Sequence, residues 1–212
     1  MVAGILQPTK IQLIPLNEMT PGMAGAIRNQ VIEAVVAQAS RELALPYDKL
    51  IVRDVRPLSD LAMYAVGTTA LTTDNWIFHA TTTTANAWTN ACANPATMAD
   101  NRFVALYGVR NGMPTEGSAG GGTAGVAGDV MVFSPICQVK INVGGSDKII
   151  WDIISTQSDR NTHVALSPSA VIIPQNATYN IQYKLTYVTA DIICHLQLVG
   201  VVVEPRGLVL SP

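Results

Sequence analysis

Charged residues are scarce in this sequence. Of its 212 residues, 13 are Lys or Arg and 15 are Asp or Glu, which amounts to 13% of the chain. A soluble domain of ordinary composition carries roughly 25%. Hydrophobic residues make up 49% of the chain, and a surface with so little charge is expected to be covered in part by other subunits. The composition therefore favours a protein that works inside an assembly.

The features of several classes of binding protein are missing as well. The net charge of −2 provides no excess of Lys and Arg to neutralise phosphates, so we expect no direct binding of nucleic acid. The longest apolar run, residues 192–203, is interrupted by polar residues and is shorter than the ~20 residues that a membrane helix needs. Residues 1–6 lack the basic start of a signal peptide. We expect no membrane span and no secretion.

Cysteine and histidine are few and widely spaced. The cysteines are Cys92, Cys137 and Cys194, and the histidines are His79, His163 and His195. Neither set shows the short spacings of metal-binding motifs, so we expect no metal ion and no other cofactor. An odd number of distant cysteines predicts buried free thiols rather than disulfides, which fits synthesis in a reducing compartment.

No catalytic residue can be named from the sequence. Gly120, Gly122 and Gly125 satisfy G-x-G-x-x-G, but the residues that follow, 129–133, have a strand pattern and provide no helix N-terminus for a phosphate. The stretch 117–128 is interpreted as a loop between strands. A G-x-S-x-G nucleophile turn is absent. We therefore expect that the protein is not an enzyme and has no small-molecule ligand.

The first 48 residues are predicted to form an extended arm and one amphipathic helix. The arm reaches Pro15, and the helix covers residues 21–44, with Thr20 as N-cap and Pro21 at the first helical position. Its apolar residues recur at four-residue spacing and form one stripe. The stripe must be buried, either on a sheet of this chain or between chains. The stripe consists of Ile27, Val31, Val35 and Ala39, with Ile32, Val36 and Leu43 beside them.

Residues 49–212 are predicted to form a mainly β domain, an antiparallel β-sandwich with a jelly-roll-like arrangement. The hydrophobic period changes to two, strand-length segments are separated by turn residues, and few helix signals remain. Residues 188–191 are predicted to be a hairpin turn that pairs the last two strands, and residues 85–99 a short helix. The expected strands are 50–55, 61–66, 75–80, 102–109, 130–133, 138–143, 148–154, 170–173, 179–188 and 192–203.

Charged residues near the start of this domain are candidates for subunit contacts. Arg53 and Arg56 flank Asp54, and either arginine could form an ion pair with a neighbouring subunit or within the chain. An exposed intramolecular pair would contribute only about 0 to 1 kcal/mol. The predicted assembly interface comprises Ile27, Val31, Val35, Arg53 and Arg56.

Four segments in the second half of the chain resemble the β-sandwich proteins of icosahedral bacteriophage virions, including capsid and cement or decoration proteins. They are FVALYGV at 103–109, GGSDKIIWD at 144–152, VIIPQNATY at 171–179 and VGVVVEPRG at 199–207. The resemblance implies a virion protein that is made in the host cytoplasm and contacts copies of itself and other capsid proteins.

Two functions fit these features of the sequence. The first is a capsid shell or capsid-stabilising subunit, in which the sandwich supplies rigid bulk while the arm and helix clamp adjacent subunits. The second is a carbohydrate- or receptor-binding module of a spike or fibre, with Trp76, Trp88, Tyr107 and the glycine-rich loop at its site, because aromatic faces stack on ligands. Core packing would explain the same aromatic residues equally well.

Overall fold

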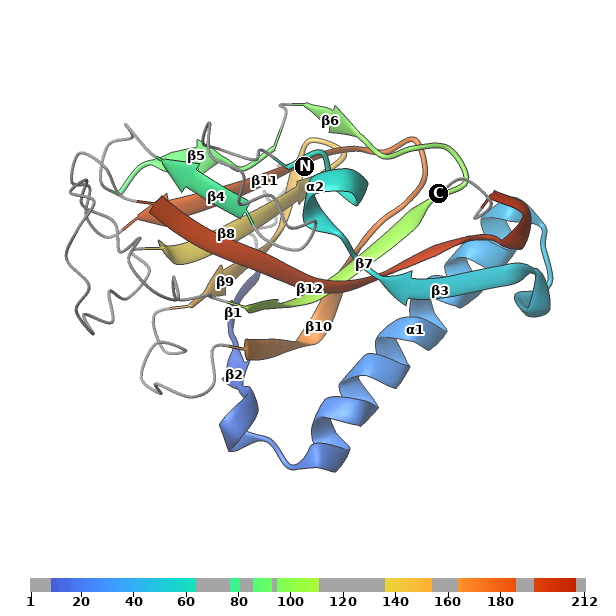
Figure 1. Ribbon diagram of the computed structural model, residues 1–212, viewed down its shortest axis with the longest axis horizontal. Helices are drawn as coiled ribbons and strands as arrows, with labels where there is room; N and C mark the ends of the chain where they lie inside the picture. The colour runs from blue at the N-terminus through green and yellow to red at the C-terminus, as the bar shows by residue number, and fades with distance from the viewer. Residues whose placement is uncertain are drawn as a thin grey trace, which may run out of the picture.

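The chain folds into two packed β-sheets with one long helix on the outer face of the second sheet (Figure 1). The computed structural model describes residues 9–63, 77–80, 86–92, 95–110, 136–153, 164–185 and 193–208. All but one of the strand pairs in these residues are antiparallel. The predicted mainly β sandwich with a single long helix is confirmed.

The first sheet, sheet A, contains six strands with β8 and β11 at its centre. Its order is β1-β9-β8-β11-β5, and β6 also pairs with β11. Buried and half-buried residues alternate in β8, β11 and the second half of β9, so one face of the sheet lies against the core and the other faces outward. The bounds are β1 Thr9–Gln12, β5 Trp88–Asn90, β6 Ala96–Thr97, β8 Ile136–Val143, β9 Ser146–Asp152 and β11 Thr178–Leu185.

The second sheet, sheet B, also contains six strands, and β7 lies in its middle. Its order is β2-β10-β7-β12-β3, and β4 pairs with another part of β12. Seven of the eight residues of β7 are buried, as expected for a strand with packing on both faces. The bounds are β2 Ile14–Pro15, β3 Leu50–Asp54, β4 Ile77–Ala80, β7 Phe103–Arg110, β10 Val164–Ile173 and β12 Ile193–Pro205.

The described part of the N-terminal arm belongs to the chain's own sandwich. β1 pairs in parallel with β9 of sheet A, and β2 pairs antiparallel with β10 of sheet B. Leu13, between the two strands, is 1% exposed and lies in the core between the sheets. Residues 9–15 therefore use backbone bonds and their central leucine inside the chain, and the expectation that the arm clamps an adjacent subunit stays a prediction.

Helix α1, Pro21–Leu43, forms a third layer on sheet B. Its start is as predicted: Pro21 occupies the first turn, and Thr20 Oγ1 accepts a hydrogen bond from the Met23 backbone N–H at 3.3 Å. It ends at Ala44, whose left-handed backbone (φ 53°) stops the helix. The apolar stripe packs against β7, β10, β12 and β3. No helix in the described residues is long and apolar enough to span a membrane.

Short helical segments complete the fold. Three are 3-10 turns: η1 Leu16–Glu18, η2 Tyr47–Lys49 and η4 Arg206–Leu208. The fourth, α2 Pro57–Asp60, follows β3 directly. It brings the chain from the edge of sheet B back over the sandwich, where the next residue, Leu61, is fully buried between the sheets.

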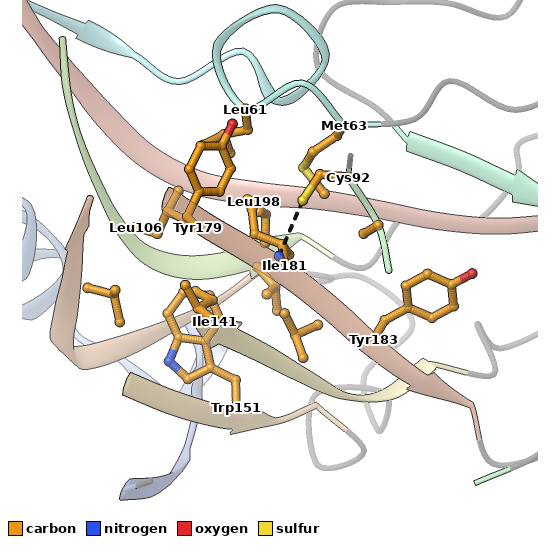
Figure 2. Close-up of a cluster of buried hydrophobic side chains, with 14 of the residues drawn as sticks. Leu61, Met63, Cys92, Leu106, Ile141, Trp151, Tyr179, Ile181, Tyr183 and Leu198 are labelled. Carbon is orange, nitrogen blue, oxygen red and sulfur yellow. Dashed lines mark hydrogen bonds between the residues drawn. The ribbon is translucent and has the colours of Figure 1, made fainter. Parts of the chain in front are cut away.

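Two hydrophobic cores hold the three layers together. The larger lies between the sheets and includes Trp151, Ile141 and Ile181 of sheet A and Leu106 and Leu198 of sheet B (Figure 2). The smaller lies between sheet B and α1. From Phe103 to Tyr107, successive residues of β7 point to alternate cores, as the two-residue period of a strand requires.

Glycine is required where the central strands of sheet B come closest. A Cβ at Gly200 would lie 2.5 Å from the carbonyl oxygen of Ala105, beside an irregularity in the register of β12 with β7. A Cβ at Gly108 would lie 2.6 Å from the carbonyl oxygen of Ala165. Both positions let the backbones approach at irregular points of the ladder.

The predicted pairing of the last two strands is wrong. β11 lies in sheet A between β8 and β5, whereas β12 lies in sheet B between β7 and the β3 and β4 segments. Both flanks of each strand are therefore occupied by other partners. Residues 186–192, where the turn was expected, lie outside the described residues, as do 64–76 and the loop 117–128.

The predicted short helix at residues 85–99 is also wrong. Trp88 pairs with Lys184 and Asn90 with Gln182, so the first part of this segment is strand β5. Asn86 has a left-handed backbone (φ 61°) that no α-helix contains. Pairing with β11 has overridden the helix propensity of the alanines.

Candidate functional site

Three of the predicted interface residues lie on the inner side of α1. Val31 and Val35 are 6% and 0% exposed and pack on sheet B. Ile27 is half-buried at the border of the same core. The chain's own sheet buries Val31 and Val35, so these two side chains are not exposed on the described fold, and the interface itself stays a prediction.

Arg53, the fourth predicted interface residue, lies on β3 and turns toward α2. Its guanidinium donates two hydrogen bonds to the Asp60 carboxylate, Nη1 to Oδ2 at 2.6 Å and Nη2 to Oδ1 at 2.7 Å. Asp54 pairs instead with Arg28 of α1 at 3.4 Å. Of the two alternatives left open for Arg53, the intramolecular ion pair is present. Arg56 is exposed, and its backbone N–H donates to Asp60 Oδ2 at 2.7 Å.

Arg53 and Asp60 belong to a charged cluster that also contains Arg102 and Glu204. Arg102 Nε donates to Glu204 Oε1, and Arg102 Nη1 lies 3.4 Å from Asp60 Oδ1. Arg53 Nη2 lies 3.3 Å from Glu204 Oε1. The cluster joins β3, α2, the start of β7 and the end of β12, so it fastens residues that are up to 151 positions apart.

The two positive and two negative charges of the charged cluster balance, and its four side chains are largely buried. The side chains of Asp60 and Glu204 are 3% and 10% exposed, and those of Arg53 and Arg102 are 27% and 26% exposed. The pKa of Arg53 is raised above its ordinary value, chiefly by its hydrogen bonds to Asp60. Each carboxylate contacts both guanidinium groups. Charges paired in this way hold segments of the fold together, whereas a catalytic acid or base must be free to transfer a proton.

The sequence singled out Arg53 but not the other three members of the cluster. Glu204 is the one detectable signal among them, because it ends a long apolar run and a buried carboxylate needs a cationic partner. Asp60 and Arg102 lie beside turns, where charged residues are ordinary. Only the packing of β3 and β7 on either side of β12 brings them together.

The outward face of sheet A is the second candidate site. We call it the open face, because no described helix packs on it, and define it by Trp88, Asn90, Lys140, Gln182 and Lys184. The register places Gln182 between Asn90 and Lys140, and Lys184 beside Trp88. All five side chains are half-buried.

Polar contacts organise the open face. Asn90 Oδ1 accepts hydrogen bonds from Gln182 Nε2 and Asn180 Nδ2, both at 2.9 Å. The ammonium groups of Lys140 and Lys184 lie 4.7 and 5.9 Å from the centroid of the Trp88 ring, within or near the range of cation–π attraction. The result is an ordered row of amides next to an indole ring and two cations.

The aromatic residues proposed for a carbohydrate site do not come together. Trp88 lies on the open face of sheet A, whereas Tyr107 is 4% exposed and packs in the core between sheet B and α1. A single site containing both residues is therefore excluded. Trp76 and the glycine-rich loop lie outside the described residues.

Two of the three cysteines are buried free thiols, as predicted. Cys92 Sγ accepts a hydrogen bond from the Ile181 backbone N–H at 3.3 Å (Figure 2), and Cys137 Sγ donates to the Lys184 carbonyl at 3.3 Å. Burial raises the pKa of both thiols, which makes them poor nucleophiles. The side chain of Cys194 lies outside the described part of the chain.

Among the residues that the structure describes, no group of three or more His, Cys, Asp or Glu side chains could hold a metal ion. In comparisons with known proteins, no family model matches the sequence, and no curated protein shows significant similarity to it.

Proposed function

We propose that this chain is a structural protein of a virus particle, a capsid shell or capsid-stabilising (cement or decoration) subunit that acts in the virion through contacts with copies of itself and with other capsid proteins. The observation that carries the proposal is the shortage of charge, 13% of residues against roughly 25% in ordinary domains. A surface of this kind is suited to burial against other subunits.

The fold adds to this argument because it buries several of the few charged residues instead of leaving them on the surface. Arg53, Asp60, Arg102 and Glu204 neutralise one another inside the charged cluster. The charge left for the surface is therefore smaller than the composition suggests. The three tightly packed layers supply a rigid body, which repeated contacts in a shell require.

Self-association is the property to test first. The purified chain is expected to form dimers or larger closed assemblies at micromolar concentrations, measured by sedimentation velocity and by negative-stain electron microscopy at several salt concentrations. Because the contacts would be mainly apolar, association is expected to persist in high salt. A chain that stays monomeric throughout this range, alone and with other proteins of its source particle, would contradict the proposal.

The open face of sheet A favours a second candidate function, the binding of carbohydrate by a spike or fibre module. The specific observation is the half-buried Trp88 ring beside two lysines and a row of amides, because aromatic rings and amide groups are common partners of sugars. Neither of the two proposed functions requires a catalytic residue.

A glycan array separates the second candidate from the first. If the open face binds sugars, Trp88→Ala is expected to reduce binding about tenfold or more, since one good aromatic contact is worth roughly 1.4 kcal/mol. Tyr47→Ala is the matched control, because Tyr47 is an aromatic residue 63% exposed outside sheet A. Absence of any glycan binding by the folded wild-type chain would eliminate this candidate.

A further inference from the structure

The outermost strand of sheet B, β3, is an open strand edge. It pairs with β12 on one side, and no described strand pairs with its other side. Its five residues make it the longest of the edge strands in the described sheets, since β1 and β4 have four residues, β5 three, and β2 and β6 two.

The register identifies which backbone groups of β3 point away from β12. The Val55 N–H donates to the Gly200 carbonyl at 3.0 Å, so these two residues form a hydrogen-bonded pair. Along an antiparallel ladder, hydrogen-bonded pairs alternate with pairs that do not hydrogen-bond to each other. The N–H and C=O groups of Val52 and Asp54 are therefore directed outward. Among the described residues, the only hydrogen bond to these outward groups comes from the Arg53 guanidinium, which donates to the Asp54 carbonyl at 3.4 Å.

β3 lacks most of the features with which natural sheets block their exposed edges. Such edges are normally blocked by proline, a bulge, lysine or an inward charge. β2 carries Pro15, and β1 carries Lys10. β3 has neither proline nor lysine, and its register with β12 is regular. Its one inward charge, Arg53, is neutralised by Asp60 and Glu204 in the charged cluster. Asp54 is the remaining charge, and Arg28 neutralises it.

We infer that β3 is a docking edge for the same strand of a second copy, which joins the two B sheets by antiparallel strand addition. This inference rests on the proposed function, because it names a contact through which copies assemble. A two-fold axis at Val52 gives a self-complementary pairing: Val52 meets its equivalent, and Leu50 lies opposite Asp54 of the other copy. Both outward groups of Val52 are then bonded.

The surroundings of β3 suit this arrangement. Leu50, Val52 and Asp54 all point to the side of the sheet that carries α1, so the two helices lie on the same face of the joined sheet. Tyr47, 63% exposed and just before β3, is brought by antiparallel pairing toward α2 of the other copy. An exposed tyrosine next to an open edge is a typical anchor of a protein interface.

Proline at position 52 tests the edge directly. The Val52 N–H faces away from β12, so Val52→Pro removes an outward donor without removing a bond of the β12 ladder. We expect sedimentation equilibrium to show self-association weakened about tenfold or more, since each dimer loses two hydrogen bonds. Val52→Thr, which keeps the N–H and nearly the same shape, is the matched control and is expected to associate as the wild type does.

The outcomes separate this inference from the proposed function. Both variants are first compared with the wild type by far-UV circular dichroism and thermal unfolding. A folded Val52→Pro that associates as tightly as Val52→Thr overturns the docking edge, while assembly itself stands. A wild-type chain that is monomeric alone but assembles with other proteins of its source particle overturns the docking edge only, and a chain that stays monomeric in both settings overturns both. As a second measurement, Val52→Cys is expected to form an intermolecular disulfide under mild oxidation, because paired residues on adjacent strands lie about 5.5 Å apart.

Discussion

Asp60→Ala is expected to lower the free energy of unfolding by about 3 to 5 kcal/mol, the usual result of removing one partner from a buried ion pair. Asp60 is 3% exposed at its side chain and accepts hydrogen bonds from the Arg53 guanidinium and the Arg56 backbone N–H. Without it, Arg53 and Arg102 would share Glu204 alone. The result would be two half-buried cations around one carboxylate, and α2 would lose its attachment to β3.

A matched control for this substitution lies six residues earlier in the chain. Asp54 also forms an ion pair, with Arg28, but the two side chains are 81% and 47% exposed. Asp54→Ala should therefore cost no more than about 1 kcal/mol. Urea unfolding followed by far-UV circular dichroism measures both variants. Equal losses for the two would mean that the charged cluster contributes no more than a surface pair does.

The local elements were predictable because their signals lie within a few residues. The helix start follows from Thr20 and Pro21, and the helix face from four-residue spacing. β8 and β11 follow from strict alternation, which specifies the buried face of each strand. The buried residues of α1, Val31, Val35 and Ala39, all belong to the stripe that the four-residue spacing selects.

The arrangement of those elements was not predictable from the same signals. Alternation shows which face of a strand is buried but not which sheet the strand joins, so β11 and β12 were wrongly paired. Ile181 of β11 and Leu198 of β12 do share one core, but they reach it from opposite sheets. Adjacency in sequence favoured a hairpin, whereas the final partners of β12 are distant strands.

The candidate sites show the same limit. An apolar stripe on α1 predicts burial, and the choice between a sheet of the chain and a second copy depends on whether sheet B has a matching apolar face. Likewise, Arg53 signals an ion pair, but its partners come from α2 and β12. A single charged residue therefore predicts that an interaction exists, while the partner is fixed by tertiary packing.

Trp151 offers the second large effect, because it is a fully buried side chain in the core between the sheets (Figure 2). Trp151→Ala is expected to cost about 3 to 5 kcal/mol, as for other large aromatic residues deleted from cores. Trp88→Ala on the open face is the matched control. Trp88 is only half-buried, so the same substitution there should cost clearly less.

A third variant, Trp151→Phe, separates packing from polarity. The Trp151 Nε1 atom is buried and has no hydrogen-bond partner among the residues that the structure describes, and leaving such a group unpaired costs about 1 to 3 kcal/mol. Phenylalanine loses part of the indole's contacts but also removes this unpaired N–H. We therefore expect Trp151→Phe to lose less than half of what Trp151→Ala loses, measured by urea unfolding with circular dichroism. Losses of similar size in the two variants would show that the indole nitrogen is not a source of instability, and that shape alone determines the contribution of this residue.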